Sequence, residues 1–309
     1  MTREVEPAGR RGPASLVLVT GHTFGRRAFE GIFSSPAFLD GRVEARLMIG
    51  LDDARAAATV GYQPLAGLAA EQGVRYLGTS DGRLTSLAGE IRAAEPAYLL
   101  VIGWSALIPP EILAVPSPAA GPGATNPAGG AFGCIGMHPT RLPHGRGQAP
   151  IPWTIIKGET RTALSVFFLE TGADTGPLIA QYGLAVHPRE TAASLFYRIG
   201  HLHFTAGHDL AEAMGRRCVP SRPQDPALAT RWPRRRPADG EILSTMSRRE
   251  IDALVRALRG PYPSAFVRTG AGGQVPIRAV LADDEAVRPA AGGLIRFRCR
   301  DGEALLVPE

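Results

Sequence analysis

Two side chains of this 309-residue sequence are suited to proton transfer, His138 and Asp174. His138 follows a short apolar run and precedes a proline in CIGMHPTRLPHGRGQAPIPW (134–153), whose prolines and glycines predict an unusual loop. Asp174 lies 36 residues later, in the glycine-flanked turn ETGADTGP (170–177). A carboxylate can orient an imidazole and raise its basicity, which suits general acid–base catalysis. The same residues also fit a histidine that caps a loop and an aspartate that nucleates a turn.

The other histidines and the cysteines predict no metal site. His201, His203 and His208 lie in one predicted helix at spacings of two and seven, whereas zinc-binding histidines on a helix are usually at i and i+4. The three cysteines are widely spaced and form no CxxC pair, which excludes a disulfide scaffold and a cysteine zinc site (Cys134, Cys218 and Cys299). This usage fits a reducing cytoplasm, where we expect the protein to act.

Apolar runs of strand length alternate with helical patterns in the first third of the chain. The runs are 15–20, 46–50 and 98–103, and the helical stretches are 24–33, 63–72 and 84–94. This alternation predicts βαβ units, an α/β fold and a parallel sheet. Ligands bind beyond the carboxyl ends of such strands. Those ends are 21–24, 103–109 and the segment after Ile135.

We expect four parts along the chain: a flexible tail (1–14), an α/β domain (15–215), a Pro- and Arg-rich connector (216–246) and a small helix-plus-β unit (247–309). In the α/β domain a short helix over 149–158 precedes two strands, 163–169 and 178–186, that flank the Asp174 turn, and a long amphipathic helix covers 191–215. The capping box from Ser247 to Glu250 opens the last unit. The runs PIRAVL, LIRFRC and ALLVP predict its strands.

Charge and hydropathy exclude several classes of protein. The net charge is +5, yet Lys157 is the only lysine, and RWPRRR (231–236) is the one dense basic cluster. We therefore expect no nucleic acid as the main partner. The chain has no run of 18 apolar residues, so we expect no transmembrane helix and no membrane partner. Residues 1–13 lack the apolar region of a secretory signal.

The site segments resemble the formyltransferase family, which uses N10-formyltetrahydrofolate and includes methionyl-tRNA, glycinamide ribonucleotide and sugar-nucleotide formyltransferases. The matching residues are HPTRLP (138–143), GRG (145–147), API (149–151), Trp153 and DTG (174–176). The resemblance extends from about residue 15 to 309 through IGWSALIPPEIL (102–113), PRRRPADGEI (233–242) and IDALVRALRGPYPSAF (251–266). It implies a Rossmann-like, mostly parallel sheet flanked by helices, with a small C-terminal β-rich subdomain.

The resemblance also implies a mechanism. An amine attacks the formyl carbon of the folate, and the tetrahedral intermediate collapses to a formamide and tetrahydrofolate. His138 would accept the amine proton or hydrogen-bond the oxyanion, and Asp174 would orient or charge His138 and help to shuttle the proton. Positioning and electrostatics suffice, so the resemblance implies no metal and no covalent intermediate.

One position departs from the family pattern. The family usually has Asn-x-His-Pro, with the asparagine amide donating to the oxyanion, whereas this chain has Gly136. The loss of one oxyanion donor costs roughly 10²–10³ in rate. A backbone N–H or water replaces the donor, another side chain such as Asn126 moves in, or the protein only binds its ligands. We favour an active enzyme, because His138 and Asp174 are both present.

The resemblance assigns two sets of ligand contacts. The folate would lie against the segment of Ser105, Leu107 and Ile108 and against the turn of Gly172 and Ala173. Core packing alone would also explain Leu107 and Ile108. The candidate substrate contacts are Thr140, Arg146, Trp153 and Arg235. Arg235 matches a basic position that could bind a diphosphate with bidentate geometry, although a solvated loop arginine fits equally.

The expected acceptor is a small amine. About 45 residues follow Pro263, roughly half of what the transfer-RNA enzymes of the family have, so the layout resembles the sugar-nucleotide formyltransferases. We therefore expect a nucleotide-linked amino sugar, in the biosynthesis of a surface polysaccharide or natural product. The alternatives are methionyl-tRNA formylation, hydrolysis of the formylfolate, and a catalytically silent folate or sugar-nucleotide binder. The small C-terminal β unit is a candidate surface for a homodimer.

Overall fold

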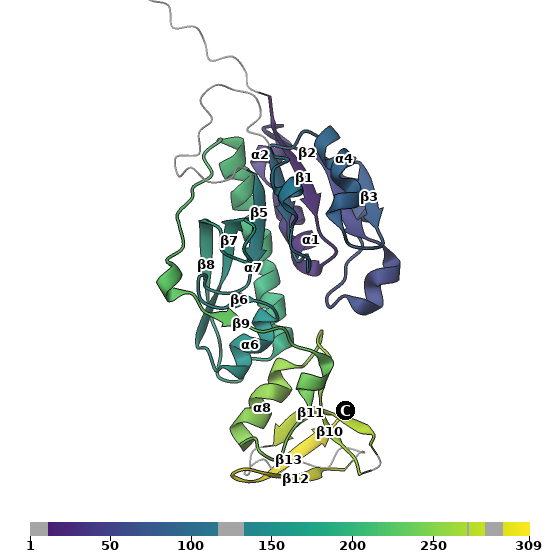
Figure 1. Cartoon of the computed structure of the whole chain (residues 1–309), viewed down its shortest axis with the longest axis vertical. Helices are drawn as coiled ribbons and strands as arrows, with labels where there is room; N and C mark the ends of the chain where they lie inside the picture. The colour runs from purple at the N-terminus through teal and green to yellow at the C-terminus, as the bar shows by residue number, and fades with distance from the viewer. Residues whose placement is uncertain (1–11, 117–132, 271, 282–292) are drawn as a thin grey trace, which may run out of the picture.

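The central element is a seven-stranded sheet of order β3-β2-β1-β4-β5-β7-β8 (Figure 1). The computed structural model describes residues 12–116, 133–270, 272–281 and 293–309, so the first eleven residues of the predicted tail and Asn126 lie outside the described residues. The first five strands in this order pair in parallel. Strand β7 pairs antiparallel with β5, and β8 pairs antiparallel with β7. The strands are β1 (Ala14–Val19), β2 (Val43–Leu51), β3 (Tyr76–Thr79), β4 (Tyr98–Val101), β5 (Cys134–His138), β7 (Arg161–Phe168) and β8 (Leu178–Ala185). The predicted mostly parallel α/β sheet is confirmed.

Helices cover both faces of the sheet, and β1 shows why. All six residues of β1 are buried, as expected of a central strand in a parallel sheet with two covered faces. Leu16 and Leu18 belong to one apolar cluster, and Val17 and Val19 belong to the other. The first cluster includes α1 (Thr23–Phe33), α2 (Pro36–Leu39), α3 (Ala66–Glu71), α6 (Pro150–Ile156) and α7 (Ala192–Gly215). The second includes η2 (Leu84–Leu87), α4 (Ala88–Ala93) and α5 (Pro110–Leu113).

A smaller unit follows at the C-terminal end (Figure 1). Its four-stranded antiparallel sheet has the order β10-β11-β13-β12. Ser247 caps α8 (Arg248–Ala257) in the capping box that the sequence predicts. Ile156 of α6 packs against both this unit's core and the larger core, so α6 and α8 join the two parts. The strands are β10 (Ala265–Arg268), β11 (Gln274–Leu281), β12 (Ile295–Cys299) and β13 (Gly302–Pro308).

The segment between α7 and α8 has little regular structure, but it pairs with the larger part. Its β9 (Arg231–Trp232) runs parallel to β6 (Arg146–Gly147), which lies in the loop after His138. Its other elements are η3 (Pro226–Leu228) and η4 (Pro237–Gly240), and a further 3-10 helix, η1 (Asp53–Ala58), follows β2. No helix in the described ranges is long and apolar enough to cross a membrane.

The helices α1 and α7 are in direct backbone contact, because each has a glycine that faces the backbone of the other helix. A Cβ atom at Gly207 would lie 2.0 Å from the carbonyl oxygen of Ala28, and one at Gly31 would lie 2.0 Å from that of Phe204. Gly200, also in α7, has no atom within 4 Å of its Cβ position. Glycine is therefore required at two of these three positions.

Gly207→Ala is expected to lower the free energy of unfolding by about 1–3 kcal/mol, because the methyl group forces α1 away from α7. The matched control, Gly200→Ala, should raise it by up to about 1 kcal/mol, since alanine favours the helix. Chemical denaturation of both variants measures the two changes. Equal changes of the same sign would contradict this account of the helix contact.

A buried histidine on α7 makes stability depend on pH. His203 is 1% exposed, its ring stacks on Phe24 with centroids 4.4 Å apart, and its Nδ1 lies 2.8 Å from the carbonyl oxygen of Ile199. Burial lowers the pKa of His203 to about 3. Below pH ~6.5 His203 is therefore protonated in the unfolded chain, whereas in the folded chain it stays neutral down to about pH 3.

We expect His203 to reduce the free energy of unfolding by up to about 1.4 kcal/mol for each pH unit below ~6.5. His203→Phe keeps the ring stack and removes this proton uptake, so its stability should fall less steeply between pH 6.5 and 4. Denaturation curves at several pH values measure both slopes. Equal slopes for the two proteins would show that this histidine does not cause the acid sensitivity.

Candidate active site

His138 is the last residue of β5 and is held by one hydrogen bond in a defined tautomer. Its side chain is buried, and its Nε2 lies 2.9 Å from the carbonyl oxygen of Gly145. A carbonyl oxygen only accepts, so Nε2 carries the proton of the neutral ring. Nδ1 is then the nitrogen with a free lone pair, and it is the atom that can take up a proton.

Asp174 lies in the turn between β7 and β8 and faces that nitrogen. Its Oδ1 is 3.9 Å from Nδ1 of His138, and its Oδ2 accepts a hydrogen bond from Gly147 N–H at 2.8 Å. The longer distance is too great for a direct hydrogen bond but short enough for the carboxylate to stabilise an imidazolium. The fold thus brings the two predicted residues together. The carbonyl of Gly145 orients the histidine, and Asp174 supplies the charge.

The backbone of Asp174 is in the left-handed region, with φ at +58°. This conformation is uncommon for residues other than glycine, although aspartate tolerates it better than most. It aims the carboxylate at β5 and at the loop after it. Asp174 is held from outside the turn by Gly147 N–H of the loop after β5 and by Gln224 of the segment between α7 and α8.

The loop after His138 passes close to β9, which explains one glycine of the GRG motif. Gly147 has a φ of +110°, and a Cβ atom there would lie 2.3 Å from the carbonyl oxygen of Trp232. On the other side, the hydroxyl of Ser165 donates to the carbonyl oxygen of Thr140 at 2.7 Å and accepts from Leu142 N–H at 3.1 Å. Ser165 pairs with His138 in the sheet register, so β7 supports the loop directly.

Thr140, a predicted substrate contact, is buried beneath this loop. Its side chain is 1% exposed, and its hydroxyl has no hydrogen-bond partner among the described residues. Its Cγ2 lies 3.0 Å from the Cβ position of Gly145, so the side chain packs under the residue that orients His138. A contact between Thr140 and a substrate stays a prediction.

Leu169 fills the space beside Gly136. A Cβ atom at Gly136 would lie 2.7 Å from Cδ2 of Leu169 and 3.4 Å from Cζ of Phe167. Both neighbours are apolar, and Leu169 also packs in the cluster that contains Trp104 and Ile108. Where the family pattern has an asparagine side chain, this chain therefore has Gly136, and the side chain of Leu169 occupies the adjacent space. Asn126, the side chain named as a possible replacement, lies outside the described residues.

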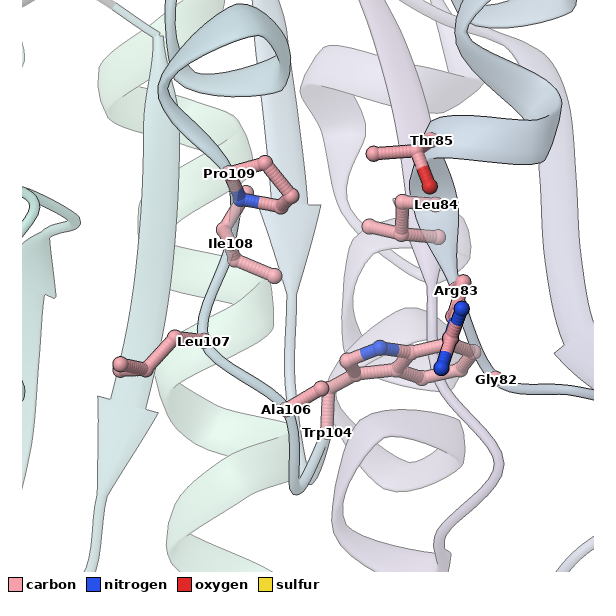
Figure 2. Close-up of a pocket in the computed structure, with 9 residues that line it drawn as sticks. All are labelled: Gly82, Arg83, Leu84, Thr85, Trp104, Ala106, Leu107, Ile108 and Pro109. Atoms are coloured by element: carbon pink, nitrogen blue, oxygen red, sulfur yellow. The ribbon is translucent and has the colours of Figure 1, made fainter.

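A pocket of about 230 Å³ lies between the loops that follow β3 and β4. Figure 2 shows the indole of Trp104 beside Arg83, with Leu84 and Thr85 on one side and Ile108 and Pro109 on the other. Two predicted folate contacts, Leu107 and Ile108, line it. Its lining does not include Ser105, Gly172 or Ala173. The structure thus places Leu107 and Ile108 together in the lining of one pocket.

Two of the predicted substrate contacts, Trp153 and Arg235, touch each other. The Arg235 guanidinium lies 4.9 Å from the centre of the Trp153 ring, and Lys157 Nζ lies 5.6 Å from the same ring. Burial lowers the pKa of Arg235, and its Nε has no hydrogen-bond partner among the described residues. Arg235 is therefore half-buried on an aromatic face, and its interpretation as a freely solvated loop arginine is wrong.

Arg146, the fourth predicted contact, leads to a residue that the sequence analysis missed. Its Nη2 and Nε donate to Oε1 of Gln224 at 2.7 and 3.2 Å. Gln224 and Thr230, which also reaches the loop after His138, belong to the predicted connector. The local sequence signal for Gln224 is limited to its place between two prolines, Pro223 and Pro226. No group of three or more potential metal ligands occurs in the described part of the chain.

Comparisons with known proteins match this architecture. Residues 63–206 match the family model described as formyl transferase. The chain is 28% identical over 203 residues to the methionyl-tRNA formyltransferase of Geobacter metallireducens, covering 66% of this chain and 60% of the relative. It is 30% identical over 218 residues to that of Myxococcus xanthus, covering 69% and 63%. The chain thus spans about three fifths of the length of these relatives.

The solved structure of WlaRD, a sugar 3N-formyl transferase in the presence of dTDP and 5-N-formyl-THF, has the same fold. It superposes with a TM-score of 0.66 at 13% identity, and the match covers 96% of this chain and 98% of that chain. At this identity the likeness concerns the fold alone. Both the seven-stranded sheet and the small C-terminal sheet lie within the matched length.

We expect Gly136→Asn to lower the free energy of unfolding by about 1–3 kcal/mol, because the new side chain overlaps Leu169. The cost should shrink when Leu169 is first replaced by alanine, which frees the space. A double-mutant cycle of Gly136→Asn and Leu169→Ala measured by denaturation gives the coupling, expected at about 0.5–3 kcal/mol. Additive effects would show that the two positions do not compete for space.

Proposed function

The chain carries a domain of the formyl transferase family, and from this premise we propose that it transfers a formyl group from N10-formyltetrahydrofolate to a primary amine of a small substrate. The observation that carries the proposal is the pair of His138 Nδ1 and Asp174 Oδ1, 3.9 Å apart at the carboxyl end of β5. The acceptor that we propose is an amino sugar linked to a nucleoside diphosphate.

The chemistry needs one base and one nearby carboxylate. The amine attacks the formyl carbon, so a C–N bond forms and the carbonyl oxygen takes the negative charge. Nδ1 of His138 accepts the amine proton, because Nε2 already carries one toward Gly145. The imidazolium forms next to Asp174, whose carboxylate stabilises it. The proton then passes to N10 as the bond from the formyl carbon to N10 breaks, which releases the formamide and tetrahydrofolate.

The pocket beside Trp104 supports the binding of the folate. Trp104, Leu107 and Ile108 supply aromatic and aliphatic surface for a flat heterocycle, and Arg83 at the same pocket supplies a cation for the carboxylates of the glutamate. Leu169 lies between this cluster and Gly136, so the formyl group would meet an apolar wall on that side. The oxyanion would then be stabilised by backbone N–H groups or by water.

The contacts of Arg235 support a nucleotide-linked acceptor. The Arg235 guanidinium, whose Nη2 donates to the carbonyl oxygen of Asp239 at 2.6 Å, stacks on Trp153 next to Lys157, and this arrangement of cations and an aromatic ring suits a diphosphate and a base or sugar ring. The fold neighbour whose structure was solved in the presence of dTDP and 5-N-formyl-THF is in agreement with this acceptor class. Thr140 and Arg146 remain proposed contacts of the acceptor.

Two other functions each have an observation in their favour. Methionyl-tRNA formylation is favoured by the names of the curated relatives. A silent folate or sugar-nucleotide binder is favoured by Leu169, which occupies the space where the family pattern has an oxyanion donor. The first predicts turnover with charged tRNA, and the second predicts ligand binding without any turnover.

His138→Ala is expected to lower amine-dependent release of tetrahydrofolate by about 10²–10⁴-fold, the usual contribution of a general base. The assay combines the protein and N10-formyltetrahydrofolate with a panel of nucleotide-linked amino sugars and with methionyl-tRNA. The control is His208→Ala, an exposed histidine of α7 distant in sequence from the site, which should keep full activity.

Three outcomes would contradict the proposal. Turnover without any amine would indicate a hydrolase. Turnover with methionyl-tRNA and with none of the amino sugars would show that the acceptor is methionyl-tRNA. Folate binding measured by calorimetry with no turnover on the whole panel would indicate the silent binder. In that case the double variant Gly136→Asn/Leu169→Ala distinguishes two explanations, an acceptor amine absent from the panel and a missing oxyanion donor. The variant gains turnover on the panel only if the missing donor is the cause.

A further inference from the structure

The segment of residues 222–232, here called the strap, contacts the loop that follows His138 and the strand that follows the Asp174 turn. At its start, Arg222 exchanges two backbone hydrogen bonds with Leu178, at 2.7 and 2.9 Å, just after the Asp174 turn. At its end, β9 pairs with β6 in the loop after His138, and the two strands lie together in Figure 1. The strap is therefore hydrogen-bonded both next to the Asp174 turn and to the loop after His138.

Gln224 holds the Asp174 turn from the strap. Its amide Nε2 donates to the carbonyl oxygen of Asp174 at 2.9 Å and to that of Gly176 at 2.7 Å. Its Oε1 accepts from Arg146, which lies in the other loop. One side chain thus satisfies the backbone of the turn in which Asp174 has its left-handed conformation and links that turn to the histidine loop.

Thr230 acts at the other end of the strap, on the histidine. Its Oγ1 accepts from Gly145 N–H at 2.8 Å and lies 2.8 Å from Nδ1 of His144. The carbonyl of the same residue, Gly145, binds Nε2–H of His138. Thr230 N–H also donates to the carbonyl oxygen of Pro143 at 3.3 Å. Thr230, 92 positions after His138 in sequence, thus binds the same residue whose carbonyl oxygen accepts from His138.

We propose that Gln224 and Thr230 are positioning residues for the His138–Asp174 pair, Gln224 through the Asp174 turn and Thr230 through Gly145. The proposal rests on the proposed function. Neither residue belongs to an apolar cluster, and Thr230 is exposed, so burial of apolar surface does not explain their contacts. Their hydrogen bonds connect instead to the two loops beside the pair: Gln224 binds the backbone of Asp174 and Gly176 and the side chain of Arg146, and Thr230 binds Gly145, His144 and Pro143.

The test compares four single variants of the full chain. Thr230→Val removes the hydroxyl at nearly constant shape, and Thr230→Ser restores it. Gln224→Met removes both amide donors and the acceptor while keeping the length of the side chain. The matched control is Asp225→Ala, which removes a strap hydrogen bond to Ala227 N–H that leads to neither catalytic residue.

We expect Thr230→Val and Gln224→Met to lower kcat by about 10–100-fold, since a misplacement of about 1 Å costs on the order of 10²-fold. KM for the folate should stay nearly constant, Thr230→Ser should recover most of the loss, and Asp225→Ala should keep full kcat. The ¹⁵N signals of the His138 ring should show a single Nε2–H tautomer in the unmodified protein and a mixture in Thr230→Val.

The proposal is overturned if folded Thr230→Val and Gln224→Met keep full kcat, if Thr230→Ser is as impaired as Thr230→Val, or if Asp225→Ala is equally impaired. A protein without turnover would refute the proposed function alone, because the tautomer measurement needs no substrate. In that case an unchanged tautomer in Thr230→Val overturns the positioning role, and a mixed tautomer supports it. If Thr230→Val does not fold, the test rests on Gln224→Met: a lower kcat at nearly constant KM supports the positioning role, and an unchanged kcat overturns it.

Discussion

The hydrogen bond from Nε2 of His138 to the carbonyl oxygen of Gly145 determines which nitrogen of the imidazole can act as a base. If Nε2 lost this acceptor, the ring could exchange tautomers, and the nitrogen that faces Asp174 would no longer be reliably free. The bond requires a loop that brings its own carbonyl back over the end of β5. That loop can pass there because Gly147 lets the backbone come within contact of Trp232.

Charge and orientation are therefore supplied by different groups in this site. Gly145 orients the ring, and Asp174 contributes a carboxylate at 3.9 Å that stabilises the protonated ring without fixing its neutral form. This division leaves Nδ1 unoccupied by a strong donor, which a base needs before the amine arrives. Gly136 lies two residues before His138 on the same face of β5, so the apolar packing of Leu169 against Gly136 borders the site on that face.

The elements with a clear pattern were predictable from the sequence. The buried run of β1, the capped helix α7 and the capping box of α8 were predicted to within one or two residues, because each signal is local. The strand β3 has only one buried residue in four, so its pattern is too weak to separate it from a loop. His138 and Asp174 were found because their residue types and the turns around them carry information on chemistry.

The residues that hold the site together give no such signal. Gln224 and Thr230 make hydrogen bonds to distant loops, and such bonds impose no periodicity on their own segment. The filling of the Gly136 space by Leu169 depends equally on the approach of two strands, β5 and the end of β7.

The position of the strap also relates the acceptor to the catalytic pair. After β9 the same segment continues to Pro233, whose carbonyl oxygen accepts from Trp153 Nε1 at 2.8 Å, and to Arg235, which stacks on that indole. An acceptor diphosphate bound by Arg235 would therefore contact the chain only five residues after Thr230. Under the proposed function, binding of the acceptor would restrict the motion of the segment that orients Gly145 and the Asp174 turn. The free energy of acceptor binding would then contribute to the geometry of the base, and binding energy used in this way raises kcat instead of lowering KM.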